Sequence, residues 1–100
     1  MASLIETIGH PGRRAMLQLV LEDELPATEL AARTGMSQPT ASQHLRVLRE
    51  AGLVVVRVDG NRRLYRVDFS GLRRLQAELE GFWGASLSAL KTAAEEEADR

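Results

Sequence analysis

Cysteine is absent from the sequence, and this absence excludes disulfide bonds, thiolate metal sites and thiol-based redox sensing within the chain. No apolar run approaches the roughly 18 residues that a membrane span needs, and the first residues lack the basic-then-apolar order of a signal peptide. A chain of 100 residues has room for one small core. We therefore expect a single domain over residues 1–100, located in the cytoplasm and without a membrane partner.

Neither sign of charge dominates the chain, whose net charge is −1, but basic residues are concentrated in its middle third. Residues 37–67 carry 6 basic and 2 acidic side chains, whereas residues 1–36 carry 3 and 5, and residues 68–100 carry 4 and 7. A protein that approaches a polyanion needs a local basic surface rather than a basic average. The distribution favours a confined nucleic-acid interface, although charge alone also fits an ordinary solvated face.

Four helices are predicted in the first half of the chain. Ser3 and Glu6 have the spacing of a capping box, which predicts a short helix over 3–9. Proline near a helix start, a serine cap and a closing glycine mark the next three helices. These helices are expected over about 11–22, 27–34 and 38–51.

The second half of the chain predicts a hairpin and then one long helix. Residues 53–58 are rich in β-branched side chains and residues 64–67 alternate as a half-buried strand does, with a turn over 59–63. Leucines and aromatic residues then recur at spacings of three and four, which predicts an amphipathic helix over about 70–94. The polar tail 95–99 is expected to fray. The fold class is thus mainly α with a small β-hairpin, in the order α-α-α-α-β-β-α.

Residues 27–51 are predicted to form a helix-turn-helix whose second helix would enter the major groove of DNA. Its outward positions carry side chains whose amide, hydroxyl and guanidinium groups can bind base edges or phosphates. These candidate DNA contacts are Ser37, Gln38, Thr40, Ser42, Gln43 and Arg46. Polar residues of this kind can also simply solvate a surface helix.

The hairpin over 53–67 shifts the balance toward DNA. Its exposed tip would present Arg62 and Arg63, and its strands carry Arg57 and Arg66. A basic hairpin beside a recognition helix can act as a wing that contacts phosphates or the minor groove. We therefore predict a winged helix-turn-helix that binds double-stranded DNA.

Five stretches resemble, in order, the signature blocks of the ArsR/SmtB family of transcriptional regulators: HPGRR (10–14), ELA (29–31), SQPTASQHL (37–45), LREAGLV (48–54) and GNRRLY (60–65). The resemblance spans roughly residues 4–90. It implies a winged-helix homodimer that represses transcription at a promoter operator. A two-fold dimer would need an imperfectly palindromic operator.

The last helix is too long for a small core to cover its whole apolar stripe, so a second copy is expected to cover the rest. The resemblance likewise implies that the first and last helices, over 3–9 and 70–94, pack against their twins. The predicted interface residues are Leu4, Ile5, Leu79, Phe82, Trp83, Leu87 and Leu90.

Many members of the family release DNA when a metal binds, but this chain lacks their cysteine pair and has no histidine in its last helix. A nickel or zinc site built from nitrogen and oxygen ligands remains open, with His10 and Glu6 as candidates four residues apart. The simpler interpretation is that His10 caps a helix. A small organic effector, a partner protein or no effector at all are the alternatives, and no cofactor is predicted outright.

Two other classes of function are weaker. An enzyme would need serine, histidine and acidic groups converging in a cleft, and both histidines are expected on or beside short surface helices. A winged helix that binds protein would predict apolar or acidic residues at Gln38, Thr40, Gln43 and Arg62, where polar and basic side chains stand. We therefore predict that the chain is not an enzyme.

Overall fold

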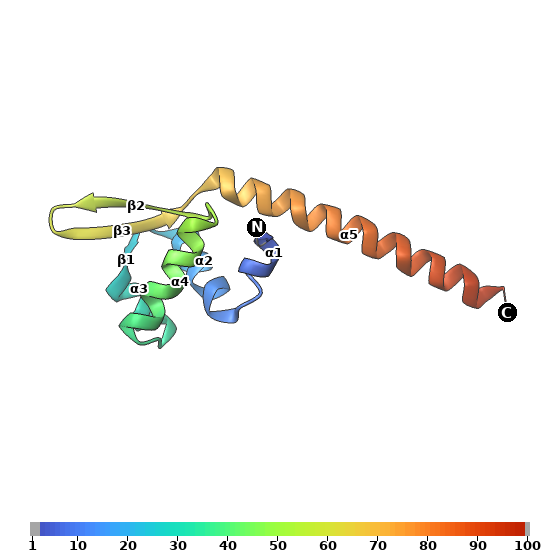
Figure 1. Cartoon of the computed structure of the whole chain (residues 1–100), viewed down its shortest axis with the longest axis horizontal. Coiled ribbons are helices and arrows are strands. Elements are labelled where there is room, and N and C mark those ends of the chain that lie inside the picture. The colour runs from blue at the N-terminus through green and yellow to red at the C-terminus, as the bar shows by residue number, and fades with distance from the viewer. Residues whose placement is uncertain (1–2, 100) are drawn as a thin grey trace.

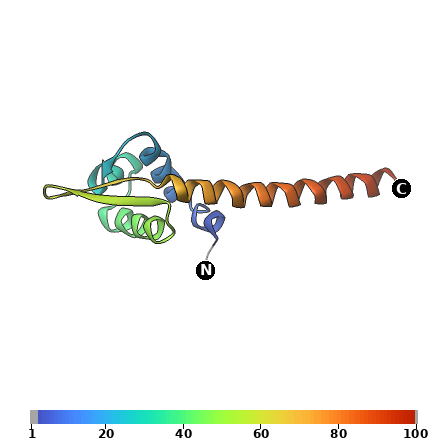
Figure 2. The same ribbon diagram turned by 90° about the horizontal axis from the view of Figure 1, so that it is seen from above.

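The computed structural model describes residues 3–99 and shows a helical body from which one long helix projects (Figure 1). The elements are α1 (Leu4–Thr7), α2 (Pro11–Glu22), β1 (Leu25–Pro26), α3 (Ala27–Thr34), α4 (Gln38–Glu50), β2 (Val54–Asp59), β3 (Arg62–Val67) and α5 (Phe69–Ala98). The molecule measures 66 × 26 × 25 Å because α5 and the β2–β3 hairpin extend in opposite directions from the body (Figures 1 and 2). The predicted fold class, mainly α with a hairpin, is confirmed.

Most helices begin where a side chain accepts a hydrogen bond from an otherwise free backbone N–H group. Ser3 Oγ accepts from the N–H of Glu6 at the start of α1, and Ser37 Oγ accepts from the N–H of Thr40 at the start of α4. The carboxylate of Asp68 does the same for α5. Helices α2, α3 and α4 match the predicted ranges to within a residue, whereas α1 is shorter than expected.

The sheet has three antiparallel strands in the order β1-β3-β2, one more than the predicted hairpin. Strand β1 is only two residues long, and its Leu25 pairs with Tyr65 of β3. The hairpin turn is also tighter than the expected 59–63, since Asp59 and Arg62 are already paired across it. A two-residue strand has no periodicity of its own, so only its pairing with β3 reveals it.

The core lies where α2, α3, α4 and the start of β2 meet. Its largest fully buried side chains are Met16, Leu30, Leu45, Leu48, Leu53 and Val54. Helix α5 joins this core through buried Leu75. It approaches closely because Gly71 lacks a side chain, and a Cβ atom there would overlap the carbonyl of Gly52.

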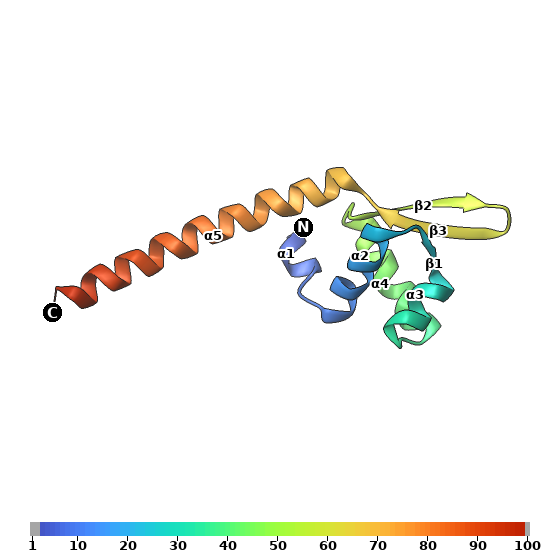
Figure 3. The same cartoon turned by 180° about the vertical axis from the view of Figure 1, so that it is seen from behind.

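Beyond its first turns, α5 leaves the body and runs on alone (Figure 3). The helix continues to Ala98 and includes most of the tail 95–99, so the predicted end near residue 94 was too early. Alanine and glutamate favour helix, and Lys91 and Glu95 form an ion pair of 3.9 Å one turn apart. Although α5 is long, neither it nor another helix in the described part of the chain is apolar enough to cross a membrane.

Candidate nucleic-acid interface

Helices α3 and α4 form the predicted helix-turn-helix. Leu30 and Ala31 of α3 pack with Ala41, Leu45 and Leu48 of α4 in the buried core. Gly35 closes α3 with a left-handed backbone (φ 72°), and this sharp turn lets α4 begin three residues later. Since α4 buries one stripe, its opposite side faces solvent.

The solvent side of α4 carries every residue that the sequence predicted for it. The side chains of Ser37, Gln38, Thr40, Ser42, Gln43 and Arg46 are all exposed, and we call this set the polar face of α4. Their amide, hydroxyl and guanidinium groups together can donate to and accept from base edges and can donate to phosphates. The exposed face therefore has the chemistry that recognition of DNA requires.

Some groups on the polar face already have partners within the chain. The hydroxyl of Ser37 donates to the hydroxyl of Thr40 (3.0 Å) while it caps α4. Arg46 pairs with Glu50 at 3.1 Å, and both side chains are largely exposed. Such an exposed pair is weak and can exchange for a phosphate contact.

Gln43 lies closest to the middle of the outward side of α4 among the predicted face residues. The helical period places it opposite the buried side chains of Ala41, Leu45 and Leu48.

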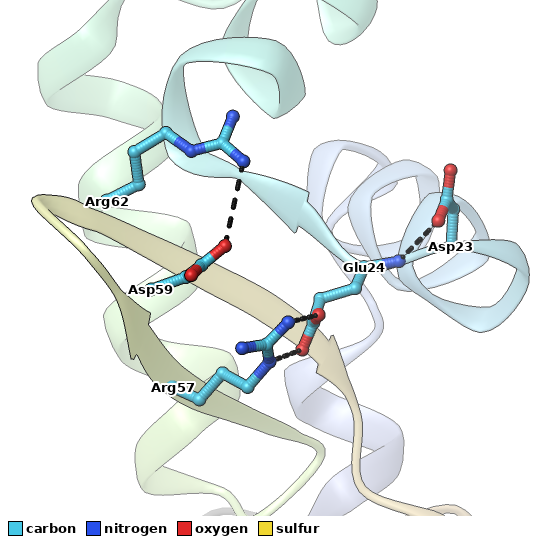
Figure 4. Close-up of polar contacts among 5 residues, drawn as sticks. All are labelled: Asp23, Glu24, Arg57, Asp59 and Arg62. Atoms are coloured by element: carbon cyan, nitrogen blue, oxygen red, sulfur yellow. Dashed lines mark hydrogen bonds and ion pairs between the residues drawn. The ribbon is translucent and has the colours of Figure 1, made fainter.

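The β2–β3 hairpin extends from the body in the direction opposite to α5 and carries exposed Arg62 and Arg63 (Figure 1). Arg62 is 4.0 Å from Asp59 across the turn, a separation at the limit for an ion pair (Figure 4). The pair is exposed, so water screens most of its attraction. The structure thus leaves both arginines accessible at the tip.

Arg57, also expected to serve the wing, is exposed but pairs with a carboxylate of its own chain. Its guanidinium donates two hydrogen bonds, of 2.6 and 2.7 Å, to the carboxylate of Glu24, which precedes β1 (Figure 4). These hydrogen bonds lower the pKa of Glu24 and raise that of Arg57, and the charge of Arg66 adds to the lowering at Glu24. Arg57 therefore anchors the hairpin and is not free for phosphates in this arrangement.

His10 and His44 lie against one another where the start of α2 meets α4. Their ring centres are 4.3 Å apart, and Arg13 Nη1 is 3.5 Å from His44 Nδ1. His10 Nδ1 accepts from the N–H of Gly12 and so caps α2, as the simpler interpretation expected. Desolvation lowers the pKa of His44, and the neighbouring positive charges of His10 and Arg13 lower it further.

The predicted metal candidates His10 and Glu6 are both exposed. Within residues 3–99, no three or more histidine, aspartate or glutamate side chains gather closely enough to hold an ion. One chain by itself therefore does not fit a nickel or zinc site of the expected kind, which needs at least three protein ligands.

The predicted interface residues fall into two groups. Leu4, Ile5 and Leu79 are half-buried and pack against the core of their own chain. Phe82, Trp83, Leu87 and Leu90 are exposed by 56%, 59%, 57% and 66%. A groove of about 490 Å³ on the same helix runs past Leu72, Leu79 and Trp83. An apolar stripe of this length is unusual on an isolated surface.

Helix α1 is tied to the rest of the molecule at both ends. The carboxylate of Glu78 on α5 accepts hydrogen bonds from the N–H groups of Leu4 (3.0 Å) and Ile5 (3.1 Å). At the other end, Arg13 donates to the carbonyl of Thr7. Arg14 donates to the carbonyls of Ile8 and Gly9. A helix of four residues cannot hold itself together, so these charged partners keep it in place.

Sequence reasoning missed Glu24 and Glu78. Glu24 and its partner Arg57 are 33 residues apart, and Glu78 and Leu4 are 74 apart. No local pattern joins residues at such separations. A weak signal was available for Glu78, because it is an acidic residue close to the apolar stripe of an amphipathic helix.

Comparison with known proteins points in one direction. Residues 10–56 match the family model described as bacterial regulatory protein, arsR family. The chain is 38% identical over 87 residues to the HTH-type transcriptional regulator Rv2034 of Mycobacterium tuberculosis, which covers 87% of this chain and 81% of that protein. It is 39% identical over 66 residues to the biofilm growth-associated repressor of Xylella fastidiosa, or 66% of this chain and 58% of the repressor.

Solved structures agree with the sequence matches. A possible transcriptional regulator for arsenical resistance superposes with a TM-score of 0.79 at 43% identity, over 83% of this chain and 86% of that one. The homodimeric winged helix-turn-helix DNA-binding domain of Mb0332 from Mycobacterium bovis superposes with a TM-score of 0.65 at 30% identity, over 82% and 76% of the two chains. The helix-turn-helix and hairpin described above are thus shared with regulators of transcription.

Proposed function

The chain belongs to the arsR family of bacterial regulatory proteins and is a DNA-binding transcriptional regulator rather than an enzyme, and we propose that it acts as a homodimeric repressor at a palindromic promoter operator. The observation that carries the proposal is the exposed polar face of α4 next to a basic hairpin. A protein of this kind works on the chromosome, so we place it in the cytoplasm.

In the proposed complex, α4 lies in the major groove. Gln38 and Gln43 would bind adenine edges, and Arg46 would bind guanine or a phosphate after leaving Glu50. Ser37, Thr40 and Ser42 would contact phosphates or bases through their hydroxyl groups. The hairpin would place Arg62 and Arg63 on the flanking backbone or in the minor groove.

The exposed apolar stripe of α5 supports the homodimer. Phe82, Trp83, Leu87 and Leu90 have no cover within the described chain, and a second copy would bury them and bring two recognition helices onto one duplex. Half-sites one helical turn apart, or a multiple of it, then follow from the two-fold axis.

A ligand that controls DNA binding would have to be of a kind that this chain can hold. Soft metal ions prefer thiolates, and the chain has none. For nickel or zinc, His10 could offer only Nε2, since its Nδ1 accepts from Gly12, and the remaining ligands would have to come from Glu6 and from the second copy. Alternatively, DNA binding is controlled by a small organic effector bound between the terminal helices, or by a partner protein.

A mobility-shift titration tests the proposal. The purified protein is titrated onto the promoter upstream of its own gene and onto a scrambled duplex of equal length and composition, over a range of salt concentrations, with and without nickel or zinc. We expect selective binding that weakens steeply with salt, because phosphate contacts release counterions. Equal binding to both duplexes, or binding to neither, would refute DNA recognition. A change on adding metal would assign a metal effector.

A further inference from the structure

A small notch lies between α4 and β3, on the side of α4 nearest the hairpin. It has a volume of about 210 Å³ and is lined by Ser42, Leu45, Arg46, Arg49 and Tyr65. Four of these five side chains carry polar groups, and three of the four come from one helix. Ser42, Arg46 and Arg49 follow one another at spacings of four and three, so they form a single row along α4.

The charge of the notch is positive and only partly balanced. Arg46 is paired with Glu50 at 3.1 Å. Arg49 has no carboxylate within ion-pair distance among residues 3–99, although its side chain lies on the same helix as Glu50. The notch thus brings together the side chains of Arg49, Tyr65 and Ser42, and no acidic side chain lines it. This set of donors suits an oxyanion.

The position of the notch adds a second argument. Two of its residues, Ser42 and Arg46, belong to the polar face of α4, and Tyr65 belongs to the strand that leads from the hairpin tip back to the body. A duplex whose major groove receives α4 and whose flank meets the hairpin must carry its backbone past the space between them.

We propose that the notch binds one backbone phosphate of the operator in each half-site, held by the Arg49 guanidinium and the hydroxyls of Tyr65 and Ser42. The inference rests on the proposed DNA-binding function and adds Arg49 and Tyr65 to its interface. The phosphate would fix how far α4 enters the groove, because its contacts join the recognition helix to the wing. Such contacts set register and affinity but carry no base information.

The first test compares Arg49→Gln with Lys91→Gln, which removes the same charge from a distant exposed site on α5. We expect Arg49→Gln to weaken binding to the operator and to a scrambled duplex by similar factors, and to lower the slope of log affinity against log salt by about one. Lys91→Gln should leave both unchanged. Tyr65→Phe should weaken binding to both duplexes, but by a smaller factor than Arg49→Gln does. Thermal unfolding of each variant confirms that it is folded, and Arg49→Lys should restore the salt slope because it restores the charge.

A phosphate scan then makes the test specific. Each operator phosphate is replaced in turn by an uncharged methylphosphonate, and the loss in affinity is measured for wild type and Arg49→Gln. We expect one position per half-site at which the methylphosphonate lowers the affinity of the wild type. At that position the modified and unmodified operators should bind Arg49→Gln equally. Equal losses for both proteins at every position would overturn the proposal, even while wild-type DNA binding stands. Failure of the wild type to select its operator would instead refute the proposed function itself.

A free phosphate ion has the same chemistry as a phosphodiester, so a last arm separates the two. Inorganic phosphate is added to the wild-type complex at constant ionic strength. We expect no loss of operator affinity beyond that in chloride, since the rest of the interface delivers the backbone phosphate to the notch. An Arg49-dependent loss would show that the notch is a site for the free ion and would overturn the proposal.

Discussion

Arg57 on β2 donates two hydrogen bonds to Glu24, so a carboxylate beside β1 pairs with one of the six basic side chains of residues 37–67. The pair joins the hairpin to the segment between α2 and β1, where no local sequence signal predicts a connection (Figure 4). It also lowers the positive charge that the wing presents. A wing that is anchored at its base can still leave Arg62 and Arg63 free at its tip.

Breaking this pair should make DNA binding less selective. In Glu24→Gln the Arg57 cation loses its partner, and the surface at the base of the hairpin gains one net positive charge. We expect higher affinity for a scrambled duplex and a steeper salt dependence, measured by mobility shift. In the double variant Glu24→Gln with Arg57→Gln the extra affinity should disappear, and its persistence would show that Glu24 acts by another route.

A second prediction concerns the carboxylate that holds α1. The hydrogen bond from the Ile5 N–H is the main cause that lowers the pKa of Glu78, and the bond from Leu4 adds to it. In Glu78→Ala we expect the protection of these two amides against hydrogen exchange to fall, while amides of α4 keep theirs. The matched control is Glu80→Ala, which removes an exposed carboxylate two residues further along α5.

The same contact gives a pH dependence with a definite sign. Because the folded-state pKa of Glu78 is lowered from its ordinary value of 4.5, its contribution to stability is complete above that value. It is lost as the pH falls through the lowered pKa of the folded state. Protection of the α1 amides in wild type should therefore drop as the pH falls below 4.5. In Glu78→Ala this protection should already be low at higher pH.

Local sequence signals were sufficient to predict the main helices of the body and the exposure of the polar face of α4. Pro11, the Ser37 cap and the apolar spacings of α4 each act within a few residues, so they predict α2, α4 and the outward position of Gln43 correctly. Which of the exposed side chains contact DNA stays a prediction, because periodicity gives the direction of a side chain and not its partner.

Most of the features that the sequence did not reveal depend on distant partners. Leu25 and Pro26 form a strand only because β3 offers its edge. Glu24 and Glu78 acquire roles only when the chain brings Arg57 and α1 beside them. The end of α5 was predicted too early, because a run of acidic residues indicates a polar tail even though glutamate and alanine also favour helix.

A third prediction follows from His44, whose pKa is lowered first by desolvation and then by the charges of His10 and Arg13. Arg46 and Glu50 also line the space beside it. The unfolded chain binds a proton at this histidine near its ordinary value of 6.5, while the folded chain does so only at lower pH. Unfolding therefore takes up a proton, and stability should fall as the pH drops below 6.5.

Thermal unfolding of wild type and His44→Gln, from above to below pH 6.5, measures this effect. The variant should show a smaller drop in melting temperature. His10→Asn keeps a capping acceptor for α2 and removes one neighbouring charge, so it should reduce the drop without abolishing it. Identical curves for wild type and His44→Gln would assign the pH dependence to other groups.

The fourth prediction separates base recognition from phosphate contact. Gln43 lies on the outward side of α4, so Gln43→Ala should lower affinity for the true operator by roughly 5- to 150-fold and change affinity for a scrambled duplex little. Arg62→Ala at the hairpin tip should weaken binding to all duplexes and lower the salt slope by about one. Mobility shifts over a range of salt measure both. Equal effects of the two variants on operator and scrambled DNA would contradict the assignment.

The fifth prediction concerns Trp83, which is 59% exposed on the part of α5 that has left the core. Its ring packs edge-on against Phe82, 6.1 Å away, and neither ring reaches the buried side chains of the body. In a homodimer the same ring would be covered, so Trp83→Glu would place a charge in the apolar interface.

We expect Trp83→Glu to be monomeric by sedimentation velocity. Its body should still fold, because Leu75 and Leu79 rather than Trp83 join α5 to the core. Lys91→Glu, on an exposed position of the same helix, is the control and should stay dimeric. Because one recognition helix binds a half-site far more weakly than two linked helices bind a palindrome, the monomer should also lose operator affinity. A folded dimer of Trp83→Glu would show that the two copies meet elsewhere.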